Sequence, residues 1–224
     1  SNLFLGHKAK KSSKIVKRYI NAGLNIFGLS NTPEFGLNIT TEPAANGATK
    51  NPWNLDYSTG GSSGGAAAAV AAGITPVAHA TDGGGSIRIP ASCCGLFGLK
   101  PSRGLTSIEN EPSGSWDGMS VGHVVSQSVR DSAAFLDAIK LDHPHLYPIP
   151  NSPSSFLEAI ENKPSQLKIG IQLSHPTHQP IDQVCLDGVN AAAQLCESLG
   201  HSTEEIMHPV DYAPVISAMS KMIN

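Results

Sequence analysis

The sequence lacks long apolar runs and any strong excess of charge of one sign, and these absences limit what the protein does. No apolar run approaches the roughly 20 residues that a membrane-spanning helix needs, and no signal peptide is visible. The formal net charge is only −3, which favours neither nucleic acid nor a membrane surface as a partner. With 224 residues, of which 40% are hydrophobic, the composition is typical of one soluble globular domain.

Cysteine pairs at metal or redox spacing are also lacking. No CxxC motif occurs, so zinc and thiol-redox functions are not expected. The adjacent Cys93 and Cys94 are expected to be buried free thiols in a reducing compartment, which predicts a cytoplasmic protein. The histidine-rich stretches HPH (143–145) and HPTH (175–178) have no clustered carboxylate or thiolate, so no metal is expected there.

What the sequence does contain is two serine sites flanked by glycines, GGSSGG at 60–65 and DGGGS at 82–86. Three consecutive glycines offer backbone N–H groups without side chains in the way, which is what an oxyanion hole requires. Ser86, at the end of this loop, is therefore a candidate nucleophile for attack on a carbonyl. A serine needs an adjacent base. Because no His or Asp stands at a triad spacing, Ser62 is the candidate proton relay.

The segment between these sites predicts a helix followed by a strand. An alanine-rich run would be capped by Ser62 or Ser63 and would end at Gly73. Its face of small residues predicts close packing against a sheet. The strand is expected at 74–80. A lone histidine in such a strand, His79, is expected to be a hydrogen-bonded structural residue rather than a base.

Three stretches together resemble the amidase signature family. They are GGSSGGAAAAVAAG at 60–73, TDGGGSIRIPASCCGLFGLKPSRG at 81–104 and SNTPEFGLN at 30–38. The resemblance implies a hydrolase in which Ser86 attacks the amide carbonyl. It also implies that Ser62, 24 residues upstream and in a cis peptide bond, relays the proton.

The same resemblance implies roles for the residues around Ser86. Thr81 and Asp82 would brace the loop. Arg88 is expected to anchor it through an ion pair with Asp82, and the alternative is contact with a substrate carboxylate. The N–H groups expected in the oxyanion hole are those of Gly83, Gly84, Gly85 and Ser86.

The catalytic lysine of the family has no counterpart in this chain. In the family it lies upstream of GGSSGG in a Lys-Asp pair, and no lysine among the first 49 residues is followed by Asp. Lys100 matches a position where the family carries a lysine in addition to the catalytic one. The chain is therefore expected to be an internal portion of an amidase, a single domain over 1–224 that is incomplete at both ends.

Helix and strand signals alternate along the chain, which favours an α/β fold with a mixed β-sheet covered by helices. A helix is expected from Ser12 or Ser13 to about Ala22, with a short buried strand at 25–29 after it. Capping signals at Ser128 and Asp131 start a second helix. A β-α-β unit is expected at 167–173, 181–199 and 203–206. The residues expected inside its helix are Val184, Val189, Ala192, Leu195 and Cys196.

These features predict a carboxamide hydrolase that acts on a small-molecule amide without a cofactor. Nucleic acid, metal and membrane are not expected partners, and a homodimer stays open. The lysines of 8–17 with Arg18 are expected to be a solvated face, and the alternative is an RNA or acidic-partner surface. Three further functions stay open: the glutamine-hydrolysing component of a tRNA-dependent amidotransferase, a hydrolase of aminoalkanoate amides, and a truncated inactive chain.

Overall fold

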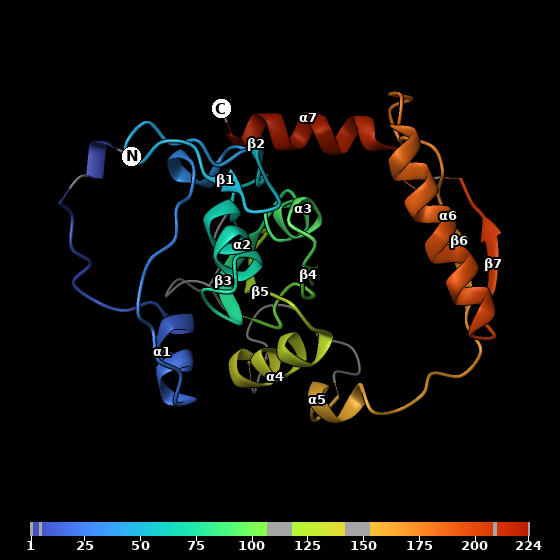
Figure 1. Cartoon of the computed structure of the whole chain (residues 1–224), viewed down its shortest axis with the longest axis horizontal. Helices are drawn as coiled ribbons and strands as arrows, with labels where there is room; N and C mark the ends of the chain where they lie inside the picture. Colours follow the sequence, from blue (N-terminus) through green and yellow to red (C-terminus); the bar gives the residue numbers. More distant parts are fainter. Residues whose placement is uncertain (1, 5, 107–117, 142–152, 208–209, 224) are drawn as a thin grey trace. The chain divides into compact units, whose positions relative to one another are not determined.

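The computed structural model describes the whole chain except residues 1, 5, 107–117, 142–152, 208–209 and 224. The chain divides into two compact units, Ser1–Asn162 and Lys163–Asn224, which are treated separately below. Figure 1 follows them from blue through yellow to red. That both units belong to a single domain stays a prediction.

The first unit is built around strand β5 (Val121–Ser126), in which all six residues are buried. It pairs antiparallel with β3 (Val77–Asp82) and with β4 (Phe97–Gly98), so the strand order is β3-β5-β4. A strand covered on both faces is rich in small and apolar residues throughout, and VGHVVS follows that pattern apart from its histidine.

Helices cover both faces of β5 (Figure 1). Successive strand residues point to opposite faces, and Val125 and Val124 accordingly belong to two separate core clusters. Val125 packs with residues of α2 (Gly64–Ala71) and α3 (Arg88–Cys93). Val124 packs with residues of α1 (Lys14–Asn21) and α4 (Val129–Ile139). The expectation of sheet covered by helices is confirmed for this unit.

Most predicted helix ends are confirmed. The Ser13 hydroxyl accepts from the Val16 N–H at the start of α1, and the Ser128 hydroxyl accepts from the Asp131 N–H at the start of α4. The prediction for α2 is wrong. Ser63 stands at its N-cap position but makes no capping hydrogen bond, because its hydroxyl is engaged with the backbone of Thr81 instead.

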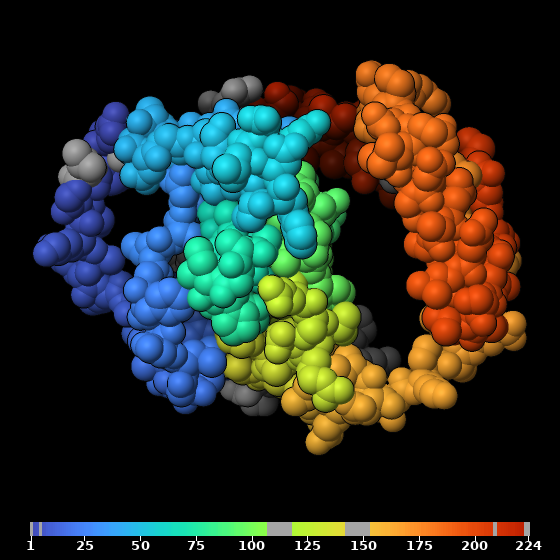
Figure 2. All heavy atoms as spheres, viewed as in Figure 1, coloured from blue at the N-terminus to red at the C-terminus, as the bar shows by residue number. Residues whose placement is uncertain are grey.

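The strand expected at 25–29 is wrong as well. The segment is irregular, and no strand among the described residues pairs with it. Its apolar side chains are exposed, Leu29 completely and Phe27 to 71%. Figure 2 shows an open gap between the dark-blue N-terminal residues and the lighter blue segment that follows α1.

Shorter elements complete the first unit. They are the 3₁₀ turns η1 (Asn2–Phe4) and η2 (Glu34–Gly36), the antiparallel pair β1 (Lys50–Asn51) and β2 (Asn54–Ser58), and α5 (Phe156–Ala159). Within the part of the chain described, no helix is long and apolar enough to cross a membrane.

The second unit contains the predicted β-α-β arrangement. Strands β6 (Lys168–Ile171) and β7 (Ser202–Glu205) are parallel and are joined through α6 (Gln183–Ser198), with α7 (Tyr212–Ile223) after them. The predicted helix interior is wrong, because no described residue of α6 is buried, and Val184 is 77% exposed. Together, the antiparallel and parallel pairs confirm the mixed α/β class.

Candidate active site

The two glycine-flanked serine loops are tied together through β3. Ser63 lies in the loop that enters α2, and Thr81 lies near the end of β3. The Ser63 hydroxyl accepts from the Thr81 N–H at 3.3 Å and lies 3.4 Å from the Thr81 carbonyl oxygen, to which it donates. Thr81 thus braces the site through its backbone. The second serine of GGSSGG fastens the first serine site to the loop that carries Ser86.

Asp82 organises the loop between β3 and α3. Its fully buried carboxylate accepts the N–H groups of Gly85 at 2.8 Å and Ile87 at 3.2 Å. Arg88 adds two side-chain bonds, from Nε at 2.9 Å and Nη2 at 3.0 Å. The ion pair that the sequence predicted between Asp82 and Arg88 is therefore present. The loop is fixed by one carboxylate that accepts from both backbone and side chain.

The pKa of Asp82 reports the balance of these interactions. Burial by itself raises the pKa of a carboxyl group, because it disfavours the charged form. The hydrogen bonds and positive charge of Arg88, together with the N–H groups of Ile87 and Gly85, outweigh the burial and hold the pKa of Asp82 below its ordinary value. Asp82 is therefore a carboxylate at neutral pH.

This arrangement corrects the expected oxyanion hole at one position. The Gly85 N–H is committed to Asp82, so it does not point freely toward a substrate oxygen. The N–H groups of Gly83, Gly84 and Ser86 make no hydrogen bond among the described residues. Glycine spacing could not separate these cases, because the choice depends on where the Asp82 carboxylate points.

Ser62 and Ser86 differ in exposure. Ser62 is 5% exposed, and the peptide bond between Gly61 and Ser62 is cis, as the resemblance implies. Ser86 is partly exposed at the entrance to α3. No hydrogen bond joins the two hydroxyls, and neither has a partner within the described residues. Gly36 lies beside Ser62, since a Cβ added to it would lie 3.5 Å from Ser62 Oγ.

None of the other basic groups considered in the sequence joins this site. Lys100 donates from Nζ to the carbonyl oxygen of Pro101 at 2.7 Å. His79 shares a hydrogen bond of 3.0 Å between its Nδ1 and the Tyr19 hydroxyl, which agrees with the structural role expected for it. Among the described residues, no group of three or more His, Cys, Asp or Glu could hold a metal ion.

Sequence reasoning missed the segment that covers the first serine loop. The Asn31 carbonyl accepts from the Gly65 N–H at 3.1 Å. The Thr41 hydroxyl donates to the Gly60 carbonyl and accepts from the Gly64 N–H. A single asparagine or threonine in an irregular segment carries no periodic signal, so only the folded chain reveals these contacts.

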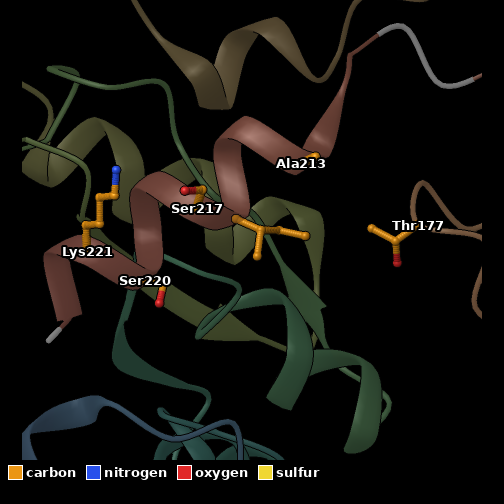
Figure 3. Close-up of a pocket in the computed structure, with 6 residues that line it drawn as sticks. Thr177, Ala213, Ser217, Ser220 and Lys221 are labelled. Atoms are coloured by element: carbon orange, nitrogen blue, oxygen red, sulfur yellow. The ribbon is translucent and has the colours of Figure 1, made fainter.

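A surface depression in the second unit does not coincide with this site. It is lined by Thr177 and by residues of α7, namely Ala213, Ile216, Ser217, Ser220 and Lys221. Figure 3 shows Ser217, Ser220 and Lys221 on α7, with Thr177 on a separate segment. None of the residues predicted to be functional lies in it.

Comparison with known proteins gives consistent results. The family model described as Amidase matches residues 1–223. The 6-aminohexanoate-cyclic-dimer hydrolase of Paenarthrobacter ureafaciens is 39% identical over 209 residues, which cover 89% of this chain and 41% of that protein. The chain thus spans less than half the length of this relative.

Two solved structures share the fold. The structure of a 6-aminohexanoate cyclic dimer hydrolase matches with a TM-score of 0.85 and 40% identity, over 90% of this chain and 42% of that one. The GatA-type chain of the glutamyl-tRNA(Gln) amidotransferase from Thermotoga maritima matches with a TM-score of 0.82 and 30% identity, over 99% of this chain and 50% of that one.

Proposed function

The chain belongs to the amidase family, and on that premise we propose that it supplies the nucleophile and the proton relay of an amide hydrolase, Ser86 and Ser62. One observation carries the proposal. Ser63 fastens the loop of Ser62 to β3, and Asp82 at the end of β3 fixes the loop of Ser86. A single strand end therefore positions both serines.

In the proposed reaction, Ser86 Oγ bonds to the carbonyl carbon of a carboxamide while its proton moves to Ser62. Ser62 Oγ delivers a proton to the leaving amine as the C–N bond breaks, which leaves an ester on Ser86. Water then adds to the ester carbonyl, releases the carboxylic acid and restores the Ser86 hydroxyl. Dividing a difficult step in this way is the general advantage of a covalent intermediate.

The negative oxygen of the tetrahedral intermediates is proposed to bind the N–H groups of Gly83, Gly84 and Ser86. Their lack of internal partners supports this choice over Gly85. Each such donor is worth about 10²–10³ in rate when it points at the developing charge. Because Asp82 already fixes the loop, the donors need no rearrangement when the charge develops.

The resemblance implies that a lysine starts the proton relay, and no lysine of this chain matches it. The chain also spans only 41% of its hydrolase relative. The activity is therefore proposed for the full-length protein. The Cys93 and Cys94 thiols, both free, agree with the prediction of a reducing, cytoplasmic location.

Active-site labelling tests the proposal. We expect a fluorophosphonate probe to add its mass to Ser86 in the full-length protein, and Ser86→Ala to abolish labelling. Ser62→Ala should slow labelling by about 10²–10⁴-fold, the usual range for loss of proton-transfer assistance. Ser92→Ala, on the exposed face of α3, is the matched control and should label like the wild type. Labelling at another residue, or equal rates for Ser62→Ala and the control, would refute the assignment.

The substrate is proposed to be a small linear or cyclic amide, because the hydrolase relatives act on 6-aminohexanoate cyclic dimer. A second candidate function is glutamine hydrolysis within a tRNA-dependent amidotransferase, which is favoured by the match to the amidotransferase chain over 99% of this chain. Ammonia release from glutamine, together with co-purifying partner proteins, would select this candidate. Turnover of 6-aminohexanoate amides by the isolated protein would select the first.

A further inference from the structure

Thr41 is fully buried beside the loop that carries Ser62, and it lies outside every motif described above. Its hydroxyl oxygen is 2.9 Å from the Gly60 carbonyl oxygen, to which it donates. The same oxygen accepts the Gly64 N–H at 3.1 Å. One side chain therefore contacts the backbone two residues before Ser62 and two residues after it.

The surroundings leave no freedom for these contacts to be replaced. A Cβ on Gly64 would overlap the hydroxyl oxygens of both Thr41 and Thr59, and a Cβ on Gly61 would lie 2.7 Å from the Thr40 carbonyl oxygen. The backbone of 40–41 thus runs directly against 60–64. The Thr49 N–H donates to the Thr41 carbonyl at 2.8 Å, which also ties the threonine backbone to its neighbours.

We propose that Thr41 is a positioning residue that holds Ser62 in place for proton relay, through Gly60 and Gly64. The inference rests on the proposed function of Ser62. Thr41 touches neither the substrate nor the reacting atoms in this mechanism. Its contribution is to fix the two ends of the arc 60–64, so that Ser62 Oγ keeps one position relative to Ser86.

Thr59 provides a matched comparison. It is also fully buried, and its hydroxyl donates to the same Gly60 carbonyl at 3.1 Å. Of the two threonines, only Thr41 accepts the Gly64 N–H. Replacing either by valine removes one donor to Gly60, but only Thr41→Val leaves the Gly64 N–H without an acceptor.

The test measures fluorophosphonate labelling of the full-length protein at varied probe concentration. We expect Thr41→Val to lower the maximal labelling rate by about 10- to 100-fold, since small displacements of reacting groups have effects of this size. The probe concentration that gives half the maximal rate should not change. Thr41→Ser, which keeps the hydroxyl, and Thr59→Val should stay within about threefold of the wild type.

An equal loss of rate in Thr59→Val and Thr41→Val would overturn the proposal, as would a Thr41→Val rate within that threefold range. Amide hydrogen exchange of the unmodified protein gives an independent readout. The Gly64 N–H should be as protected as the interior amides of α2, and rapid exchange would overturn the proposal even where a variant fails to fold. If the wild type does not label at all, the proposed function fails, while Gly64 exchange still decides the role of Thr41.

Discussion

Asp82 is the residue with the most demands on it, because one buried carboxylate holds the loop backbone and the Arg88 side chain together. Asp82→Asn removes the charge and at least one acceptor. Hydrogen bonds to charged groups contribute about 1.5–3 kcal/mol. Because the Arg88 side chain is 54% exposed, water compensates part of its loss. We expect a fall of about 1–3 kcal/mol in the free energy of unfolding, measured by urea denaturation.

The control for Asp82 is Arg130→Ala, which removes an ion pair with Glu161 in which both side chains are more than 60% exposed. Such surface pairs contribute about 0–1 kcal/mol. Equal urea midpoints for Asp82→Asn and the wild type would contradict the role assigned to this carboxylate. We also expect Asp82→Asn to label more slowly at Ser86, since the loop loses its fixed geometry.

At this scale the sequence predicts a partner when the two residues are near in the chain and opposite in charge. Asp82 and Arg88 satisfy both conditions, and their ion pair was predicted. The use of the Gly85 N–H was not predicted, because it depends on the direction of a carboxylate. The contacts of Thr41 were not predicted either, since it lies 23 residues from Gly64 in a segment without periodicity.

At the scale of the element, Asp137 on α4 anchors the start of α5. Its carboxylate accepts from the Phe156 and Leu157 N–H groups, each at 2.9 Å, and from the Ser155 hydroxyl. Burial pushes the pKa of Asp137 upward, but these donors and Lys140 prevail and lower it to about 2. The carboxylate thus caps a helix that is distant in the sequence.

The lowered pKa predicts a pH dependence with a definite sign. A carboxyl group with a pKa of about 2 in the folded state and about 3.9 in the unfolded state contributes stability above pH 4. That contribution is lost as the pH falls from 4 toward 2. Between pH 6 and pH 3, we expect the wild type to lose up to about 2 kcal/mol more than Asp137→Asn, as measured by urea denaturation at each pH.

Glu158→Gln is the matched carboxylate-to-amide control on α5, because the Glu158 carboxylate has no hydrogen bond among the described residues. It should lose stability with falling pH as the wild type does. If Asp137→Asn showed the same pH dependence as this control, the assigned anchor would be wrong.

Elements with local signals were predicted well, and those that depend on a partner were not. Ser13 and Ser128 cap α1 and α4 through hydrogen bonds within a few residues, so sequence alone suffices. The strand at 25–29 was predicted from its composition, but a strand needs a neighbour to satisfy its backbone groups. No described strand pairs with this segment.

For the whole chain, the two units differ in how far their hydrogen bonds are shielded from water. All six residues of β5 are buried, whereas no residue described between 163 and 221 is. Backbone groups with few buried contacts open with little free energy. We expect the amides of β6, β7 and α6 in this 224-residue chain to exchange faster than those of β5.

Native-state hydrogen exchange followed by mass spectrometry measures this difference. Helix α4 is the internal reference, because it is hydrogen-bonded like α6 but buries Ala133, Leu136 and Ile139. Exchange of α6 as slow as that of α4 would contradict the expectation.

The order of strands and helices in the second unit was predicted, but its burial was not. Periodicity identifies the apolar side of α6, including Val184 and Leu195, yet both are exposed. Whether an apolar face is buried depends on what packs against it, and this information does not lie in the helix itself. Chain topology is thus easier to predict here than solvent exposure.

The ion pair of Asp82 and Arg88 closes residues 82–88 into a ring. A ring has a fixed circumference, so its members cannot change in number without opening it. Substitutions at Gly84, which is exposed, leave the closure intact, whereas an insertion or deletion of one residue between the two ends separates the carboxylate from its guanidinium. The loop that carries Ser86 is therefore constrained in length more strictly than in composition.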